Sequence, residues 1–288
     1  MSDRIQHYGA SGSWYDEPVL DDPTLQRFRA ELADGAGVDL GRAALVLGMF
    51  ASPELDVAAY LRRLDQLAGD ADERSLRPAD TIASLFQEDG LRGDEDNYDD
   101  PRNSLVDEVL DRQLGIPISL AVIAIEVGRR LGITVEGVPF PGHFLIRVRS
   151  EGGAVILDPF RGGGAVSDGE LLLRLRAVTG RIAALGPAEL GVADSAAILA
   201  RMLQNLKAIY LKNQEFDLAL AIQDRLLVVR GDTLIERRDR GLIYARMNRH
   251  VEAEVDLAAY LDATPEAGDA DAVREILGHV RERRGPAN

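Results

Sequence analysis

The chain has 288 residues, enough for about two domains, and 46% of them are apolar, as in an ordinary globular protein. Its 33 basic and 48 acidic residues leave a formal net charge of −15, which argues against nucleic-acid binding and against an anionic membrane as a partner. The absence of cysteine excludes disulfides, thiolate metal sites and a cysteine nucleophile. No apolar run approaches about 18 residues, and the first residues lack a secretory signal pattern, so we expect a cytoplasmic protein without a membrane segment.

The first part of the chain predicts a loosely held arm followed by helices. The arm covers residues 1–22, and Asp22 with Pro23 is typical of a helix cap followed by a proline in the first turn. Apolar spacing and helix-start signals predict four helices in this order: residues 23–33, residues 40–50, a helix capped by Ser52 and opened by Pro53, and a helix after Pro78.

An acidic loop over residues 93–101 follows these helices. Its aspartates alternate somewhat like calcium ligands. Counted from Asp94, however, Asp99 stands where a calcium loop needs a glycine, and Leu105 stands where it needs a glutamate. The mismatch favours a solvated acidic loop over a metal site.

The most apolar helix is expected at the centre of the chain. Residues 104–114 predict one helix, and Gly115, Ile116 and Pro117 interrupt it. Pro117 then suits the first turn of a second helix, over residues 118–131, which is apolar almost all round and is therefore expected to be buried. The amides at such a helix start can stabilise an oxyanion, and Ser119 is the one nucleophilic side chain on this turn.

Strand signals follow, and they bring a histidine and an aspartate together. The expected elements are strands over residues 134–138, 143–148 and 154–157, a turn at 151–153 and a helix over 168–176. This turn places Asp158 opposite about Leu145, so His143 and Asp158 are diagonal neighbours within hydrogen-bonding reach. Such a pair is the orienting half of a nucleophilic triad. The pair is also compatible with a structural histidine that the aspartate hydrogen-bonds in a polar corner of the fold. The spacing alone favours this structural interpretation.

The last third of the chain predicts only helices and contains a repeat. Tyr210 and Tyr244 are 34 positions apart, and Gly241 occupies a small-residue position of the tetratricopeptide pattern. Two copies and a final helix over residues 269–284 bury little apolar surface, so we expect the array to pack on the preceding domain. The predicted parts of the chain are residues 1–22, 23–190 and 191–288.

Four motifs in the middle of the chain carry a family resemblance. They are Asn-Tyr-Asp-Asp-Pro-Arg-Asn-Ser at 97–104, Gly-Ile-Pro-Ile-Ser-Leu at 115–120, Gly-Val-Pro-Phe-Pro-Gly-His-Phe-Leu at 137–145 and Leu-Asp-Pro-Phe at 157–160. Together with the segments 238–242 and 256–261, they resemble the SirB family of transglutaminase-like proteins and its tetratricopeptide tail. The resemblance covers about residues 38–277.

The resemblance implies an α+β domain of the papain and transglutaminase type, with N-terminal helices and a small antiparallel sheet, followed by an all-α tetratricopeptide-like array. Catalytic members of the wider superfamily use cysteine, histidine and aspartate. His143 and Asp158 match the second and third of these, whereas Pro117, two residues after Gly115, stands at the place of the cysteine. The resemblance therefore implies the fold but not the cysteine chemistry.

Three functions remain open, and all of them use His143. The favoured one is a non-catalytic protein, without cofactor or metal, that binds a peptide or protein partner through its repeats and a groove. The expected groove residues are Asn103, Pro117, Phe140 and Phe144. The alternative is a hydrolase or acyltransferase using Ser119 with His143 and Asp158, although two helical steps turn Ser119 about 200° from Pro117. A metal site of His143 and acidic-loop carboxylates ranks last.

Overall fold

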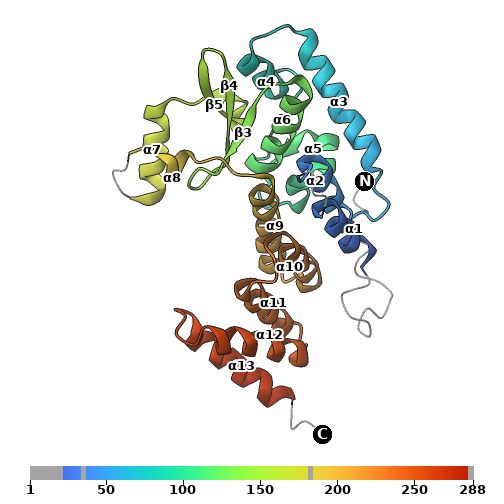
Figure 1. Ribbon diagram of the computed structural model, residues 1–288, viewed down its shortest axis with the longest axis vertical. Coiled ribbons are helices and arrows are strands. Elements are labelled where there is room, and N and C mark those ends of the chain that lie inside the picture. Colours follow the sequence, from blue (N-terminus) through green and yellow to red (C-terminus); the bar gives the residue numbers. More distant parts are fainter. Residues whose placement is uncertain (1–21, 34–36, 181–183, 285–288) are drawn as a thin grey trace. The chain divides into compact units, whose positions relative to one another are not determined.

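The computed structural model describes residues 22–33, 37–180 and 184–284 (Figure 1). By its internal contacts the chain divides into two compact units, residues 1–202 and residues 203–288. The arm expected over residues 1–22 lies, except for Asp22, outside the described residues.

Helices make up most of the first unit. They are α1 (Pro23–Leu32), α2 (Leu40–Gly48), α3 (Val57–Glu73), α4 (Pro78–Gln87), α5 (Val106–Arg112), α6 (Pro117–Leu131), α7 (Asp168–Thr179), α8 (Pro187–Leu190) and the first part of α9 (Ser195–Lys212). The start expected for α3 at Ser52 and Pro53 is wrong. Asp56 supplies the cap instead, since its carboxylate accepts the Ala59 amide at 3.0 Å.

The helix expected over residues 104–114 is also shorter than predicted. A 3₁₀ turn, η3 (Pro101–Ser104), precedes it, and α5 ends at Gln113, whose φ is 58°. The residues after Gln113 do not continue α5, because they form β2 (Leu114–Gly115), which pairs in parallel with β1 (Arg92–Gly93). This small pair holds the start of α6 in place.

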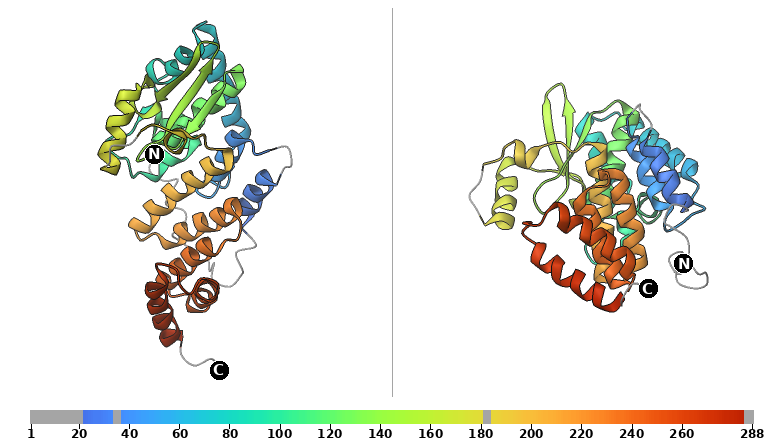
Figure 2. Two further views of the ribbon diagram at one scale, coloured as in Figure 1. Left: turned by 60° about the vertical axis from the view of Figure 1, so that its left-hand side comes forward. Right: turned by 60° about the horizontal axis from the view of Figure 1, so that its bottom comes forward.

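The main sheet has four antiparallel strands in the order β3-β4-β5-β6. They are β3 (Val135–Val138), β4 (Leu145–Ser150), β5 (Gly153–Asp158) and β6 (Gly164–Ala165), and the longer ones run side by side in the left view of Figure 2. The pairing of Ile146 with Leu157 sets the register that places Leu145 opposite Asp158. This is the register predicted from the hairpin turn.

The sheet lies between α6 and α7 in Figure 1. Helix α6 is buried along most of its length and contacts β3, β4 and the helices α2, α3 and α5. On the other side, Leu171 and Leu175 of α7 join a buried apolar cluster with Val138, Phe140 and Leu145. This packing brings α7 to the end of the sheet at which β5 finishes.

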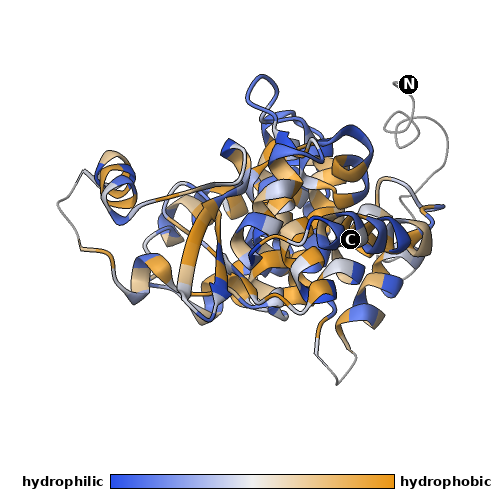
Figure 3. Ribbon diagram, turned by 90° about the horizontal axis from the view of Figure 1, so that it is seen from above, coloured by the Kyte–Doolittle hydropathy of each residue, from blue (hydrophilic) through white to orange (hydrophobic). Residues whose placement is uncertain are grey.

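The second unit is a series of antiparallel helices of the expected tetratricopeptide type. After α9 come α10 (Phe216–Arg230), α11 (Leu234–Arg246), α12 (His250–Ala263) and α13 (Ala270–Arg284), each packed on the next. Figure 3 shows hydrophobic and hydrophilic residues interspersed along the helices. Within the described ranges, no helix is long and apolar enough to cross a membrane.

Candidate functional site: a histidine held by an aspartate

The His143–Asp158 pair forms where two neighbouring strands come together. Gly142, with φ 73°, makes the turn that precedes His143, and the His143 amide donates to the Phe140 carbonyl at 2.9 Å. The imidazole Nε2 lies 2.8 Å from Oδ1 of Asp158, the last residue of β5. The predicted hydrogen bond is confirmed. His143 itself lies in the turn just before β4, because strand pairing begins at Leu145.

Asp158 is a buried carboxylate with more partners than the sequence indicated. It is 1% exposed, its Oδ1 also accepts the amides of Phe160 at 3.1 Å and Arg161 at 3.3 Å, and its Oδ2 lies 2.6 Å from a guanidinium nitrogen of Arg174. Burial alone would raise the pKa of Asp158. The hydrogen bond from His143 and the ion pair with Arg174 outweigh burial and hold the pKa below its ordinary value. Asp158 is therefore ionised at neutral pH.

The predicted nucleophile position at the start of α6 is enclosed by the protein. Pro117 is buried as the first residue of the helix. Ser119 is 0% exposed, and its hydroxyl donates to the Asn103 carbonyl at 2.5 Å and accepts the Ile116 amide at 3.1 Å. The Ser119 hydroxyl thus serves to start the helix, in the manner of a capping side chain.

The four residues expected to line a groove are core residues instead. Asn103 is 0% exposed, Phe140 1% and Phe144 3%, and Pro117 is buried with them. Asn103 donates its amide to Asp94 at 3.1 Å and accepts from Arg112 at 3.0 Å, so it ties the acidic loop to α5. The prediction of a groove lined by these residues is wrong, because tertiary packing turns them into the interior.

Aromatic rings lead from His143 to the surface. The Phe160 ring meets the His143 ring edge-on at 6.1 Å between centroids, and the Tyr98 ring meets Phe160 edge-on at 5.8 Å. Phe160 lies so close to Gly93 that a Cβ there would be 2.5 Å from the ring. Tyr98 is 48% exposed. We call His143, Phe160 and Tyr98 the aromatic row.

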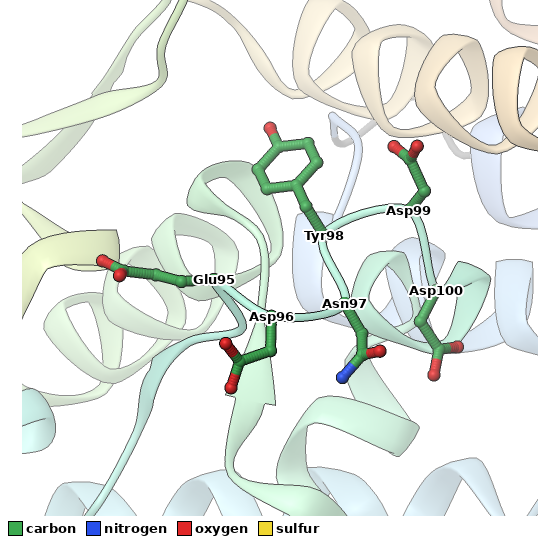
Figure 4. A pocket seen from close by; sticks show the side chains of 6 residues that line it. All are labelled: Glu95, Asp96, Asn97, Tyr98, Asp99 and Asp100. Atoms are coloured by element: carbon green, nitrogen blue, oxygen red, sulfur yellow. The ribbon is translucent and has the colours of Figure 1, made fainter.

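The acidic loop forms an open pocket of about 450 Å³. The lining residues are Glu95, Asp96, Asn97, Tyr98, Asp99 and Asp100, and Figure 4 shows Tyr98 and Asp99 projecting to the side opposite Asp96 and Asn97. Asp94, near the start of the loop, is buried, and its carboxylate accepts a hydrogen bond from the Asn97 amide at 3.0 Å. Among the residues that the structure describes, no group of three or more histidines and carboxylates is placed to hold a metal ion.

Arg174 is the site residue that the sequence did not indicate. It lies in the predicted helix 168–176, which also contains Arg176, and no spacing rule connects either arginine with Asp158. The packing of Leu171 and Leu175 against the sheet determines that Arg174, and not Arg176, reaches the carboxylate.

Comparison with protein families agrees with this architecture. Residues 58–204 match the family model described as the transglutaminase-like superfamily, and residues 206–278 match the tetratricopeptide repeat. The fold and the site thus define a transglutaminase-like domain followed by tetratricopeptide repeats. Repeats of this kind indicate a role in protein–protein interaction.

Bacterial relatives match between about 60% and 90% of the chain. A UPF0162 protein of Xylella fastidiosa is 37% identical over 257 residues, which cover 86% of this chain and 90% of the relative. A UPF0162 protein of Vibrio cholerae is 32% identical over 253 residues, 85% and 92% of the two chains. Protein SirB1 of Salmonella typhimurium is 28% identical over 180 residues, 62% and 66%. The chain belongs to the UPF0162 family of transglutaminase-like proteins, as the SirB resemblance implied.

Proposed function

We propose that this chain is a non-catalytic transglutaminase-like protein that acts by binding a protein or peptide partner. The observation that carries the proposal is Pro117 at the start of α6, the place that the family resemblance gives to the cysteine. The proline nitrogen is part of a peptide bond and is no nucleophile, and the chain contains no thiol elsewhere. His143 and Asp158 therefore form the orienting half of a triad that lacks its nucleophile.

The burial of Ser119 supports the same proposal over the serine alternative. A serine nucleophile must reach both the substrate and its general base. The Ser119 hydroxyl is buried and bonded to Asn103 and Ile116, and turning it toward a substrate would break both of these hydrogen bonds. The Ser119 hydroxyl therefore has a structural role in the fold.

The aromatic row is the surface that we assign to the partner in the first unit. The His143 side chain is 18% exposed and Tyr98 is 48% exposed, so the row offers apolar area with a polar tip at each end. Aromatic side chains of this kind contribute strongly to peptide binding. The tetratricopeptide repeats supply a second interaction surface.

The absence of catalysis is tested with a fluorophosphonate probe, which labels activated serines, and with an assay for incorporation of a primary amine into a glutamine peptide. We expect neither labelling nor incorporation. Labelling of Ser119 that disappears in His143→Ala would overturn the proposal and establish the serine hydrolase.

Binding is tested with peptides selected from a display library on the full-length chain and measured by titration. Tyr98→Ala is expected to weaken binding about tenfold, because it removes the exposed end of the aromatic row. Leu76→Ala is the matched control, since Leu76 is 43% exposed elsewhere in the first unit. Equal affinities for the two variants would contradict the assignment of the partner to the aromatic row.

A further inference from the structure

Helix α12 of the second unit has an exposed apolar stripe as well as a buried apolar face. Its buried face packs on α11 and α13 (Figure 1). Val251 is 53% exposed and Val255 is 62% exposed, and residues four apart are neighbours on one face of a helix. Valine is a poor helix former, and an exposed valine gains little from burial, so these two residues contribute little to the stability of the chain by itself. We call Val251 and Val255 the valine stripe.

The charges on both sides of the valine stripe are already paired within the chain. At about 100° per residue, Glu252 lies on one side of the stripe and Glu254 on the other. Glu252 accepts from Arg249 at 2.7 Å, and Glu254 accepts from Arg281 at 2.9 Å and from Arg284 at 2.6 Å. Covering the stripe therefore leaves no unpaired charge directly beside it, which is the costly outcome when charged surface is buried.

The two ends of the stripe carry opposite charges. Asp262 lies eleven residues after Val251, about 20° around the helix, so it shares the face of the stripe. It stands in the last turn of α12, where the helix dipole disfavours a negative charge. Arg246 ends α11, just before α12 begins. Both residues are exposed, and neither forms an ion pair with another residue that the structure describes.

The second unit is nearly neutral, unlike the chain as a whole. Residues 203–288 contain 13 basic and 15 acidic residues, so most of the net charge of −15 belongs to the first unit. Repulsion between like charges opposes the association of acidic proteins. This repulsion is weak between two copies of the second unit, so a contact between them is the form of self-association that the charge distribution favours.

We propose that the valine stripe is the contact surface for a second copy of this chain, with the two α12 helices antiparallel about a two-fold axis at the level of Ala253. A two-fold contact must be complementary to itself. Around this axis, Val251 of one protomer meets Val255 of the other. Asp262 lies nine residues, or about 14 Å, from the axis, and Arg246 lies seven residues to its other side. Each Asp262 therefore meets Arg246 of the other protomer.

The test begins with sedimentation equilibrium of the full-length chain at about 1–300 µM. The stripe is short, so we expect a weak dimer with a dissociation constant of about 10–100 µM. The average mass should rise with concentration from 31.3 kDa toward twice that value. A chain that stays at 31.3 kDa over the whole range would overturn the proposal and leave the stripe to a different protein.

The apolar centre is tested with Val255→Glu, which is expected to raise the dissociation constant at least about tenfold, because two carboxylates then enter the contact. Leu173→Glu is the matched control, since Leu173 is 69% exposed on α7 in the first unit, and it should dimerise as the native chain does. Circular dichroism checks that both variants are folded. Native dimerisation of Val255→Glu would place the dimer contact elsewhere and overturn the proposal.

The antiparallel arrangement is tested by reversing the charges at the ends of the stripe, which also decides the outcome if Val255→Glu does not fold. Asp262→Arg and Arg246→Asp should each weaken the dimer about tenfold, because each places like charges together twice. An equimolar mixture of the two variants should dimerise about as well as the native chain, since both end contacts are again opposite in sign. A mixture as weak as its two components would overturn the antiparallel contact.

Discussion

Two serines that are both 0% exposed differ in what their hydroxyls bond. The Ser119 hydroxyl makes hydrogen bonds to the Asn103 carbonyl and the Ile116 amide, whereas the Ser104 hydroxyl has no hydrogen-bond partner among the described residues. A buried hydroxyl without a partner costs free energy, and one that caps a helix start stabilises it. The Ser119 hydroxyl therefore stabilises the fold through hydrogen bonds, whereas the Ser104 hydroxyl makes none among the described residues.

Ser119→Ala is expected to lower the free energy of unfolding by about 1–2 kcal/mol, since it removes the two hydrogen bonds of the hydroxyl and leaves the Ile116 amide and the Asn103 carbonyl with only their bond to each other at 3.2 Å. Ser104→Ala should change it by less than about 1 kcal/mol, in either direction. Urea unfolding of the two variants and the native chain measures the difference. Equal losses of stability would contradict the role of Ser119 at the start of α6.

Asp107, on α5, introduces a dependence of stability on pH. Asp107 is 2% exposed, and its Oδ1 has no hydrogen-bond partner among the described residues. The same Oδ1 lies so close to Gly48 that a Cβ on Gly48 would be 2.6 Å from it. Burial, followed by the nearby Glu108 charge, raises the pKa of Asp107 to about 7. The folded chain therefore binds this proton more tightly than the unfolded chain does.

The protonated Asp107 carboxyl makes its full contribution to the free energy of unfolding below about pH 4. This contribution is lost as the pH rises to about 7, because a raised carboxyl pKa favours the protonated folded state. Asp107→Asn is neutral at every pH, so it should remove this part of the decline and stabilise the chain by a few kcal/mol at about pH 8. Urea unfolding at about pH 5 and about pH 8 tests it. A variant with the native pH dependence would refute the assignment.

At the scale of elements, close approach between helices decides where glycine is required. Gly241 of α11 faces α12, where an added Cβ would lie 2.9 Å from Leu257 and 3.1 Å from the Asp256 Cβ. Gly278 of α13 has open space around it. Both glycines are inside helices, so they have the same unfavourable propensity and differ only in packing.

Gly241→Val is expected to destabilise the chain by about 1–3 kcal/mol, because the branched side chain must push α11 and α12 apart. Gly278→Ala should stabilise it by up to about 1 kcal/mol through helix propensity alone. Thermal unfolding followed at 222 nm, a signal dominated by helices, compares the two. A Gly241→Val variant as stable as the native chain would show that the pair does not pack closely.

At the scale of the whole molecule, α9 belongs to both units. Its first turns lie in the first unit, where Ile198 packs against Gly137 of β3 and the Ala193 amide donates to the Gly137 carbonyl at 2.9 Å. Its later residues lie in the second unit, where Lys207 binds Gln223 and Asp239. Any cut at the start of the repeat array therefore exposes apolar surface of α9 that is buried in the full-length chain.

A fragment of residues 195–288 is expected to melt at lower temperature and less cooperatively than the full-length chain. Removal of β3 exposes Ile198, and two repeats bury little apolar surface of their own. Circular dichroism melts of both chains measure this. A fragment that melts as sharply and at the same temperature as the full-length chain would contradict the expectation that the array depends on the preceding domain.

Local patterns predicted most of the elements and the central pair of the site. The start of α6 at Pro117, the turn at 151–153 and the His143–Asp158 hydrogen bond depend on residues close in sequence, whose geometry is constrained by φ, by strand alternation and by a short hairpin. The pattern does not locate the cap of α3, because Ser52 and Asp56 are both good capping residues and only packing chooses Asp56.

The sequence by itself thus determined the fold class, the repeat array, the pairing of His143 with Asp158 and the absence of a thiol. Only the tertiary structure decided that Arg174 completes the site, that Ser119 bonds Asn103, and that Phe140 and Phe144 are buried. The physical reason is that periodicity reports which face of an element is apolar, whereas the partner of a buried polar group depends on which separate elements pack together.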